Sequence, residues 1–266
     1  MTEVSEASPL IDQYVHLFYE EEPRFDIDAL TGAWAEEGYE CQAEVPRREK
    51  GEEVLAFRGG TLVIVSGLPR SIEDRFAAPA QRLATFDYDW SRTHVVDPRA
   101  ALRDLARARF AVQVRTRVER PVALAMAAND LVCTLVGIDR VHPFVAAWFE
   151  GPSLLVGRAD LTEYLAYQET RKQASPRTPD SLLFSLVLSG EAPLALGTKG
   201  LAFFEHPELY AHGGSFDPVP VLYNAAAHVV SGATLRPGHT ISMSQGELEV
   251  VAGEFDGHPA LQLIAR

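Results

Sequence analysis

The chain has 266 residues, of which 47% are hydrophobic and 23% are charged, and its formal net charge at pH 7 is −13. This composition is typical of a globular protein with a substantial core, and it excludes the low-hydrophobicity, high-charge pattern of intrinsic disorder. A net acidic chain repels nucleic acid and anionic membranes, so we expect neither as a partner. The apolar runs, such as 131–138 and 182–188, are much shorter than the ~18 residues that cross a bilayer.

The N-terminus and the cysteines bear on where the chain works. Residues 1–8 carry Glu3 and Glu6 and lack the basic start and apolar core of a secretory signal, so we expect a cytoplasmic location. Cys41 and Cys133 each stand in an apolar segment, which indicates buried thiols rather than a disulfide framework or a cysteine-based zinc site. We expect no cofactor.

The first elements alternate between strand and helix. Residues 14–19 are aromatic and β-branched, which predicts a strand. Asp26 then stands as an N-cap before apolar residues at helical spacing, so a helix is predicted up to Gly38. Further strands are predicted at 40–45, 54–57 and 61–66, the last two forming a hairpin.

A helix and a strand follow in the basic part of the chain. Asp97 and Pro98 are a cap and a first helical residue, which predicts a helix up to residue 108. From 109 to 118, apolar and polar residues alternate with the period of a half-buried strand. We expect Phe110, Val112 and Val114 to be buried. We expect Arg109, Gln113 and Arg115 on the opposite face to be exposed.

The remaining elements complete two lobes of an α+β protein. A helix is predicted from Pro121 to Val136 and ends at Gly137, followed by strands at 144–149 and 154–156 and a helix at 160–172. Later elements are expected at 182–188, 194–204, 218–230, 247–252 and 260–264. The predicted fold class is α+β, with mixed, mainly antiparallel sheets and packed helices. The predicted domains are a larger lobe at 1–172, a proline-containing linker at 173–181 and a smaller β-β-α-β-β lobe at 182–266.

The segment 196–209, LGTKGLAFFEHPEL, carries a resemblance. It is similar to the late motif of an uncharacterised bacterial family, domain of unknown function 4261: a threonine, a glycine, an aromatic residue and a Glu-Leu pair. The matching positions are Thr198, Gly200, Leu201, Phe204, Glu208 and Leu209. Weaker likenesses at 66–69 and 110–114 extend the resemblance over most of the chain, whereas Arg107, Ala108 and Arg109 stand where family members often carry a histidine. The resemblance implies a fold and no catalytic residue.

Two clusters of side chains could carry chemistry. His206, Glu208 and His212 supply two imidazoles and a carboxylate, which suit a divalent metal or an acid/base pair. Against this, Pro207 prevents a helix from aligning them, and the competing interpretation is a solvated loop in which Glu208 accepts backbone N–H bonds. The second cluster is a basic patch of Arg103, Arg107, Arg115 and Arg117. It either binds an anion, pairs with the acidic N-terminal part of the chain, or is simply a solvated face.

Three functions follow from these observations. The first 60 residues hold 15 acidic and 5 basic residues, which favours a non-enzymatic module that docks a basic partner protein, such as an immunity-type inhibitor of a bacterial toxin. The second hypothesis is a metal-dependent enzyme or small-ligand binder that uses the His206, Glu208 and His212 loop. The third is a structural adaptor of a larger bacterial assembly.

Overall fold

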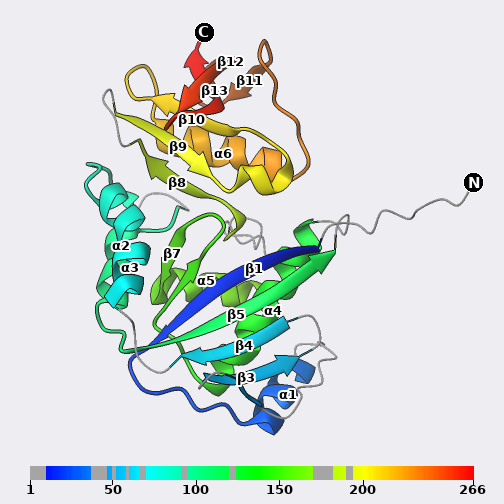
Figure 1. Cartoon of the computed structure of the whole chain (residues 1–266). Coiled ribbons are helices and arrows are strands. Elements are labelled where there is room, and N and C mark those ends of the chain that lie inside the picture. Colours follow the sequence, from blue (N-terminus) through cyan, green and yellow to red (C-terminus); the bar gives the residue numbers. More distant parts are fainter. Residues whose placement is uncertain are drawn as a thin grey trace, which may run out of the picture.

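A computed structural model describes residues 10–36, 47–49, 52–57, 60–65, 70–90, 95–119, 124–169, 182–189 and 194–266. The described chain forms two sheets with helices packed on them, and only the pair β10 and β13 runs parallel among the described strand pairs (Figure 1). The predicted α+β class is therefore confirmed. Among the described residues, no helix is long and apolar enough to cross a membrane.

The first sheet has strands in the spatial order β2-β3-β4-β5-β1-β6-β7. Their bounds are β1 (Leu10–Tyr19), β2 (Arg47–Glu49), β3 (Glu52–Phe57), β4 (Gly60–Val65), β5 (Phe110–Glu119), β6 (Ala146–Phe149) and β7 (Leu154–Gly157). The predicted hairpin of β3 and β4 is confirmed. The strand predicted at 40–45 lies outside the described residues.

Helices cover both faces of this sheet. One face shares a core with α1 (Ile27–Glu36), α4 (Leu124–Val141) and α5 (Arg158–Glu169), and the other packs on α2 (Arg70–Ala84) and α3 (Pro98–Leu105). Consequently Val15 and Leu17 of β1 are buried on one side, and Phe18 is buried on the other. We call this sheet with its five helices the first lobe.

The double covering changes the expected burial of β5. Val112 and Val114 are buried and Arg109 is exposed, as predicted. In contrast, Phe110, Gln113 and Arg115 are all half-buried, while Ala111 on the second face is buried. The alternation rule assumes that one face meets water, and here α2 and α3 occupy part of that face.

The helix starts follow the sequence more closely than the helix ends. Asp26 accepts hydrogen bonds from the backbone N–H groups of Asp28 and Ala29 (2.8 and 3.0 Å), and Asp97 caps α3 in the same way. The helix predicted to end at Gly137 instead continues to Val141. Helix α2, which contains Pro79, was not predicted.

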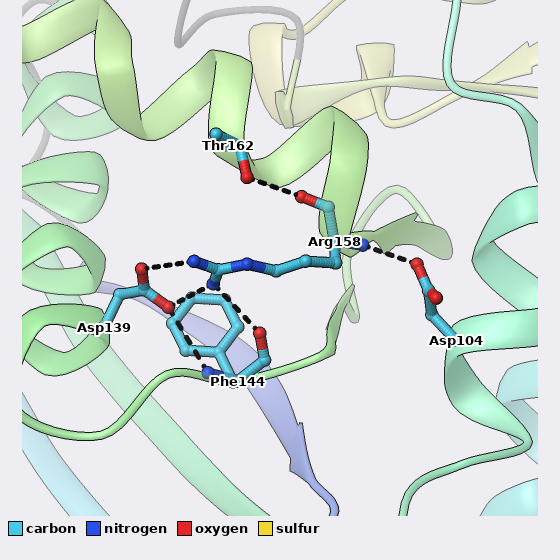
Figure 2. A network of polar contacts seen from close by, with 5 residues as sticks. All are labelled: Asp104, Asp139, Phe144, Arg158 and Thr162. Carbon is cyan, nitrogen blue, oxygen red and sulfur yellow. Dashed lines mark hydrogen bonds and ion pairs between the residues drawn. The ribbon is translucent and has the colours of Figure 1, made fainter.

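A polar network ties three helices of the first lobe together (Figure 2). The guanidinium of Arg158, at the start of α5, donates to both carboxylate oxygens of Asp139 on α4 and to the carbonyl of Phe144. The backbone N–H of Arg158 donates to Asp104 Oδ2 of α3 at 2.7 Å. Because Gly157 precedes α5 and has no side chain, Asp104 supplies the cap from another helix.

The second sheet has strands in the order β11-β12-β13-β10-β9-β8. Their bounds are β8 (Ser185–Leu188), β9 (Ala195–Lys199), β10 (Glu208–His212), β11 (Thr240–Met243), β12 (Gly246–Phe255) and β13 (His258–Ala265). Helix α6 (Pro218–Val230) packs on one face, and the short 3₁₀ helix η3 (Leu201–Phe204) joins β9 to β10. The β-β-α-β-β prediction missed β10 and β11. This sheet with α6 and η3 is called the second lobe.

The two lobes lie against each other (Figure 1). Leu83, Trp90 and Val95 belong to the first part of the chain, yet they are buried in the same core as α6 and the second sheet. The residues of the predicted linker, 173–181, lie outside the described residues. The division into domains at 1–172 and 182–266 stays a prediction about independent folding.

Candidate functional site

A cleft of about 440 Å³ lies where the two lobes meet. The first lobe contributes the middle of β1, one residue of α4 and the turn after β6, and the second lobe contributes the end of β9, η3 and the start of β10. The lining residues are Gln13, Tyr14, Val15, Leu131, Phe149, Glu150, Gly151, Pro152, Leu182, Leu183, Lys199, Gly200, Ala202, Phe203 and Glu208. The volume and the mainly apolar lining with a few polar groups are typical of small-molecule sites.

Glu208 organises the wall that the second lobe contributes. Its Oε1 accepts hydrogen bonds from the backbone N–H groups of Gly200 (2.9 Å) and Ala202 (3.4 Å), at the start of η3. Its Oε2 accepts from the hydroxyl of Thr198 at 2.8 Å, and the same hydroxyl oxygen accepts from the backbone N–H of Leu209 at 2.8 Å. One carboxylate therefore holds the end of β9, the start of η3 and the start of β10 together.

Gly200 is required at this position for two reasons. Its φ of 117° lies in the left-handed region, where a side chain is strained. A Cβ there would also stand 2.4 Å from the carbonyl oxygen of Leu183, across the cleft wall. The structure thus brings Thr198, Gly200 and Glu208 into one hydrogen-bonded unit, while Phe204 is half-buried and packs against the core of the second lobe.

The histidines of the predicted metal cluster lie apart from one another. His206 is 6% exposed; its Nδ1 is 2.6 Å from the carbonyl oxygen of Pro207, and its Nε2 accepts from the backbone N–H of Leu235 at 3.1 Å. These partners assign a neutral ring with the proton on Nδ1. His212 ends β10, where its ring meets Tyr210 edge-on.

The strand between these residues explains the separation. Glu208 and His212 lie at opposite ends of β10, and four residues of strand span roughly 13 Å. Of the three, Glu208 alone lines the cleft. Within the described ranges, no group of three or more His, Cys, Asp or Glu side chains is placed to share a metal ion. The competing interpretation, a solvated loop in which Glu208 accepts backbone N–H bonds, is right about the hydrogen bonds of Glu208. It is wrong about the loop, because Glu208–His212 form an interior strand of the second sheet.

A histidine and a glutamate that the sequence analysis did not select meet beside the cleft. His16 Nε2 is 3.4 Å from Glu150 Oε2 and 3.4 Å from Gln113 Nε2. Its ring packs against Phe76 and Trp148, with centroid distances of 4.9 and 5.4 Å. Since 134 residues separate His16 from Glu150, no local pattern could have paired them.

The four arginines of the predicted anion patch have different surroundings. Arg107 pairs with Glu20 and, at 3.6 Å, with Asp104, as expected if the basic residues pair with the acidic N-terminal part. Arg115 is half-buried, with its guanidinium 5.6 Å from the ring centre of Tyr14. Arg103 is exposed on α3, and the side chain of Arg117 lies outside the described part of the chain. Of the arginines whose side chains the structure describes, Arg103, Arg107 and Arg115 do not line the cleft.

Comparisons of the chain with protein-family models, with curated proteins and with solved structures find no match. The resemblance of residues 196–209 to the uncharacterised bacterial family stays a prediction.

Proposed function

We propose that the chain is a binding protein for a small, mainly apolar molecule, which it holds in the cleft between its two lobes. The observation that supports this most directly is the cleft of about 440 Å³, closed on one side by the Glu208 network. Volume and lining together fall within the range of small-molecule sites, and a position between lobes is a common place for them. This is the ligand-binding form of the second hypothesis, without the metal.

The rigidity of the second-lobe wall also supports binding. Thr198 is 1% exposed, and its hydroxyl donates to Glu208 and accepts from Leu209. A wall held by hydrogen bonds to a carboxylate keeps its shape before a ligand arrives, so little ordering has to accompany binding.

Two glycines allow a matched test. Gly151 lines the cleft and Gly213 lies elsewhere in the second lobe; both are exposed, and a Cβ on either would meet no atom within 4 Å. Titration with Nile red, an uncharged apolar dye, is expected to show one saturable site with enhanced emission. Gly151→Trp should remove that site by filling the rim, while Gly213→Trp should leave it unchanged.

A second substitution that fills the cleft from its other wall shows that the loss of dye binding does not depend on the turn at Gly151. Ala202 is exposed on the opposite wall of the cleft, so Ala202→Trp should also weaken dye binding. Circular dichroism of all variants checks that the fold is retained. Equal dye binding by wild type, Gly151→Trp and Ala202→Trp would overturn the proposal.

Docking of a basic partner protein stays a second proposed function, favoured by one surface feature. From the end of β1 into the first turn of α1, the acidic residues Glu21, Glu22, Asp26 and Asp28 are exposed, with Arg24 as the exposed cation among them. A partner that docks here by charge should be captured less well at high salt. Capture from a lysate of the source organism, identified by mass spectrometry, should fail for Glu21→Gln/Glu22→Gln and persist for the exposed pair Glu247→Gln/Glu254→Gln. Unchanged capture by the first pair would exclude this surface.

A further inference from the structure

Strand β11 forms one edge of the second sheet, at the end away from the first lobe (Figure 1). Its inner side bonds to β12: a two-residue turn follows Met243, and the N–H of Val250 donates to the carbonyl of His239 at 2.9 Å. Inward and outward residues alternate along an antiparallel strand, so Thr240 and Ser242 direct their backbone N–H and C=O groups outward. Within the described ranges, no residue bonds to these outward backbone groups.

This edge lacks the features that usually protect a sheet from pairing with another chain. Such features are charged side chains, prolines and bulges, and β11 with its sequence Thr-Ile-Ser-Met contains none of them. Thr240 and Ser242 are exposed, while Ile241 and Met243 are half-buried against the core of the second lobe. Helix α6 packs mainly on β8, β9 and β10, at the other end of the sheet. An added strand would therefore satisfy the outward backbone groups and cover the outer flanks of two apolar side chains.

The charge around the edge indicates which strand fits there. Residues 231–246 contain no aspartate or glutamate, although the chain has 37 acidic residues. Two copies of such an acidic chain repel each other over most of their surface, and they repel least where acidic residues are absent. Glu247 and Glu249 lie on β12, so between two copies paired at β11 they would stand three strand spacings, roughly 14 Å, apart. This separation exceeds the ~8 Å Debye length at physiological salt.

An antiparallel pair of β11 strands is also complementary to itself. When the twofold axis passes at Ile241, Thr240 of one copy faces Ser242 of the other, and these are the residues with outward backbone groups. Ile241 then faces its own copy, and Met243 faces His239. No charged side chain of the strand meets its own copy in this register.

We propose that β11 is a self-association edge, at which a second copy of this chain adds its own β11 antiparallel and joins two six-stranded sheets into one. The inference is independent of ligand binding in the cleft, because β11 contributes no residue to the cleft. Main-chain hydrogen bonds supply the affinity, as in other cases of strand addition, and the side chains set the register. Since one short strand makes the contact, the dimer belongs to the transient class that forms as concentration rises.

Sedimentation equilibrium over a range of concentrations tests the association. The mass of the wild-type chain should approach twice the monomer mass at high concentration, and added salt should strengthen association by screening the repulsion between copies. Ser242→Pro removes an outward N–H and no inward one, so it should weaken association roughly tenfold or more. Ser242→Ala keeps the N–H and should associate like the wild type. A wild-type chain that stays monomeric, which would leave the edge to another protein, overturns the proposal, as does equal association of Ser242→Pro and Ser242→Ala.

Cross-linking through single cysteines tests the register and does not depend on the proline variant. Facing residues that are not hydrogen-bonded have Cα atoms about 4.5 Å apart, which a disulfide can bridge. Ile241→Cys should therefore give a covalent dimer under mild oxidation. Met243→Cys should not, because the two cysteines would stand four residues of strand, roughly 13 Å, apart.

Two controls accompany the cross-linking. The wild-type chain reports any link through Cys41 or Cys133, and circular dichroism checks that both variants keep the fold. Equal cross-linking of Ile241→Cys and Met243→Cys, or no cross-linking of Ile241→Cys above the wild-type level, overturns the proposed pairing.

Discussion

The phenol of Tyr88 donates a hydrogen bond of 3.0 Å to Oδ2 of Asp217, and the other oxygen of this carboxylate caps α6 by accepting from the N–H of Val219 at 3.0 Å. Tyr88 follows α2 of the first lobe, and Asp217 begins the helix of the second lobe. One carboxylate therefore both starts α6 and joins it to the other lobe. The contact also governs how the protein should respond to alkaline pH.

Burial, followed by the hydrogen bond and the negative charge of Asp217, raises the pKa of Tyr88 to about 12 from 10.0. Because the pKa in the folded state lies above that of the unfolded state, the stabilisation is fully present below pH 10 and is lost as the pH rises through about 12. We expect Tyr88→Phe to lower the free energy of unfolding by about 0.5–1.5 kcal/mol at pH 8. Urea unfolding from pH 8 to 12 should show this difference shrinking above pH 10; a constant difference would contradict it.

Gly137→Ala is expected to destabilise the protein although alanine favours helices. A Cβ at position 137 would stand 2.2 Å from Cδ1 of Trp34, whose side chain is fully buried and whose indole N–H donates to the carbonyl of Thr134 at 3.1 Å. Because the ring has no room to move, Gly137→Ala should lower the free energy of unfolding by about 3 kcal/mol. Urea unfolding measures it.

Gly32→Ala provides the matched control for that experiment. Gly32 lies in α1 with no atom within 4 Å of its added Cβ. The substitution should raise the free energy of unfolding by up to about 1 kcal/mol through helix propensity alone. Equal effects of Gly137→Ala and Gly32→Ala would mean that the packing of Trp34 does not determine the first result.

Glu208→Ala should affect stability and dye binding together. It removes the acceptor for the hydroxyl of Thr198 and for the N–H groups of Gly200 and Ala202. Hydrogen bonds to a charged group are worth about 1.5–3 kcal/mol, so we expect a loss of this order together with weaker Nile red binding. Thr198→Val should also lower stability and weaken dye binding, whereas Glu247→Ala should change neither stability nor dye binding. Normal dye affinity in Glu208→Ala would show that the network does not shape the cleft.

Asp104→Ala tests the cap that α5 receives from another helix. The substitution leaves the N–H of Arg158 without its acceptor, and loss of a helix cap costs about 1 kcal/mol. Asp28→Ala removes an exposed acid from the first turn of α1 and should cost less. Thermal unfolding by circular dichroism compares the two; a smaller loss in Asp104→Ala than in Asp28→Ala would contradict the assignment.

Limited proteolysis tests the domain division at the predicted linker. Cleavage is expected first near 175–178, because the predicted linker 173–181 is polar and contains Pro176 and Pro179. After the cut, the two fragments should still elute together in size-exclusion chromatography, since Leu83, Trp90 and Val95 are buried in the core of the second lobe. Separation into two folded fragments would show independent domains.

The sequence by itself determined the fold class and the starts of α1, α3 and α6. Asp26 and Asp97 begin their helices where the capping pattern predicted, and α6 has the predicted bounds. These features depend on residues close together in the chain, so periodicity and caps suffice to find them. Alternation along β5 also placed Val112 and Val114 in the core.

What only the tertiary structure decided depends on contacts between distant residues. Gly137 does not end its helix; a glycine stands there because the ring of Trp34 occupies the space that a side chain would need. Strand β10 forms although Pro207 precedes it, because β9 and β13 form hydrogen bonds with its two edges. The cleft arises in the same way, from residues as far apart as Gln13 and Glu208. Local patterns carry no information about which distant segments meet, since that is set by the packing of whole faces against one another.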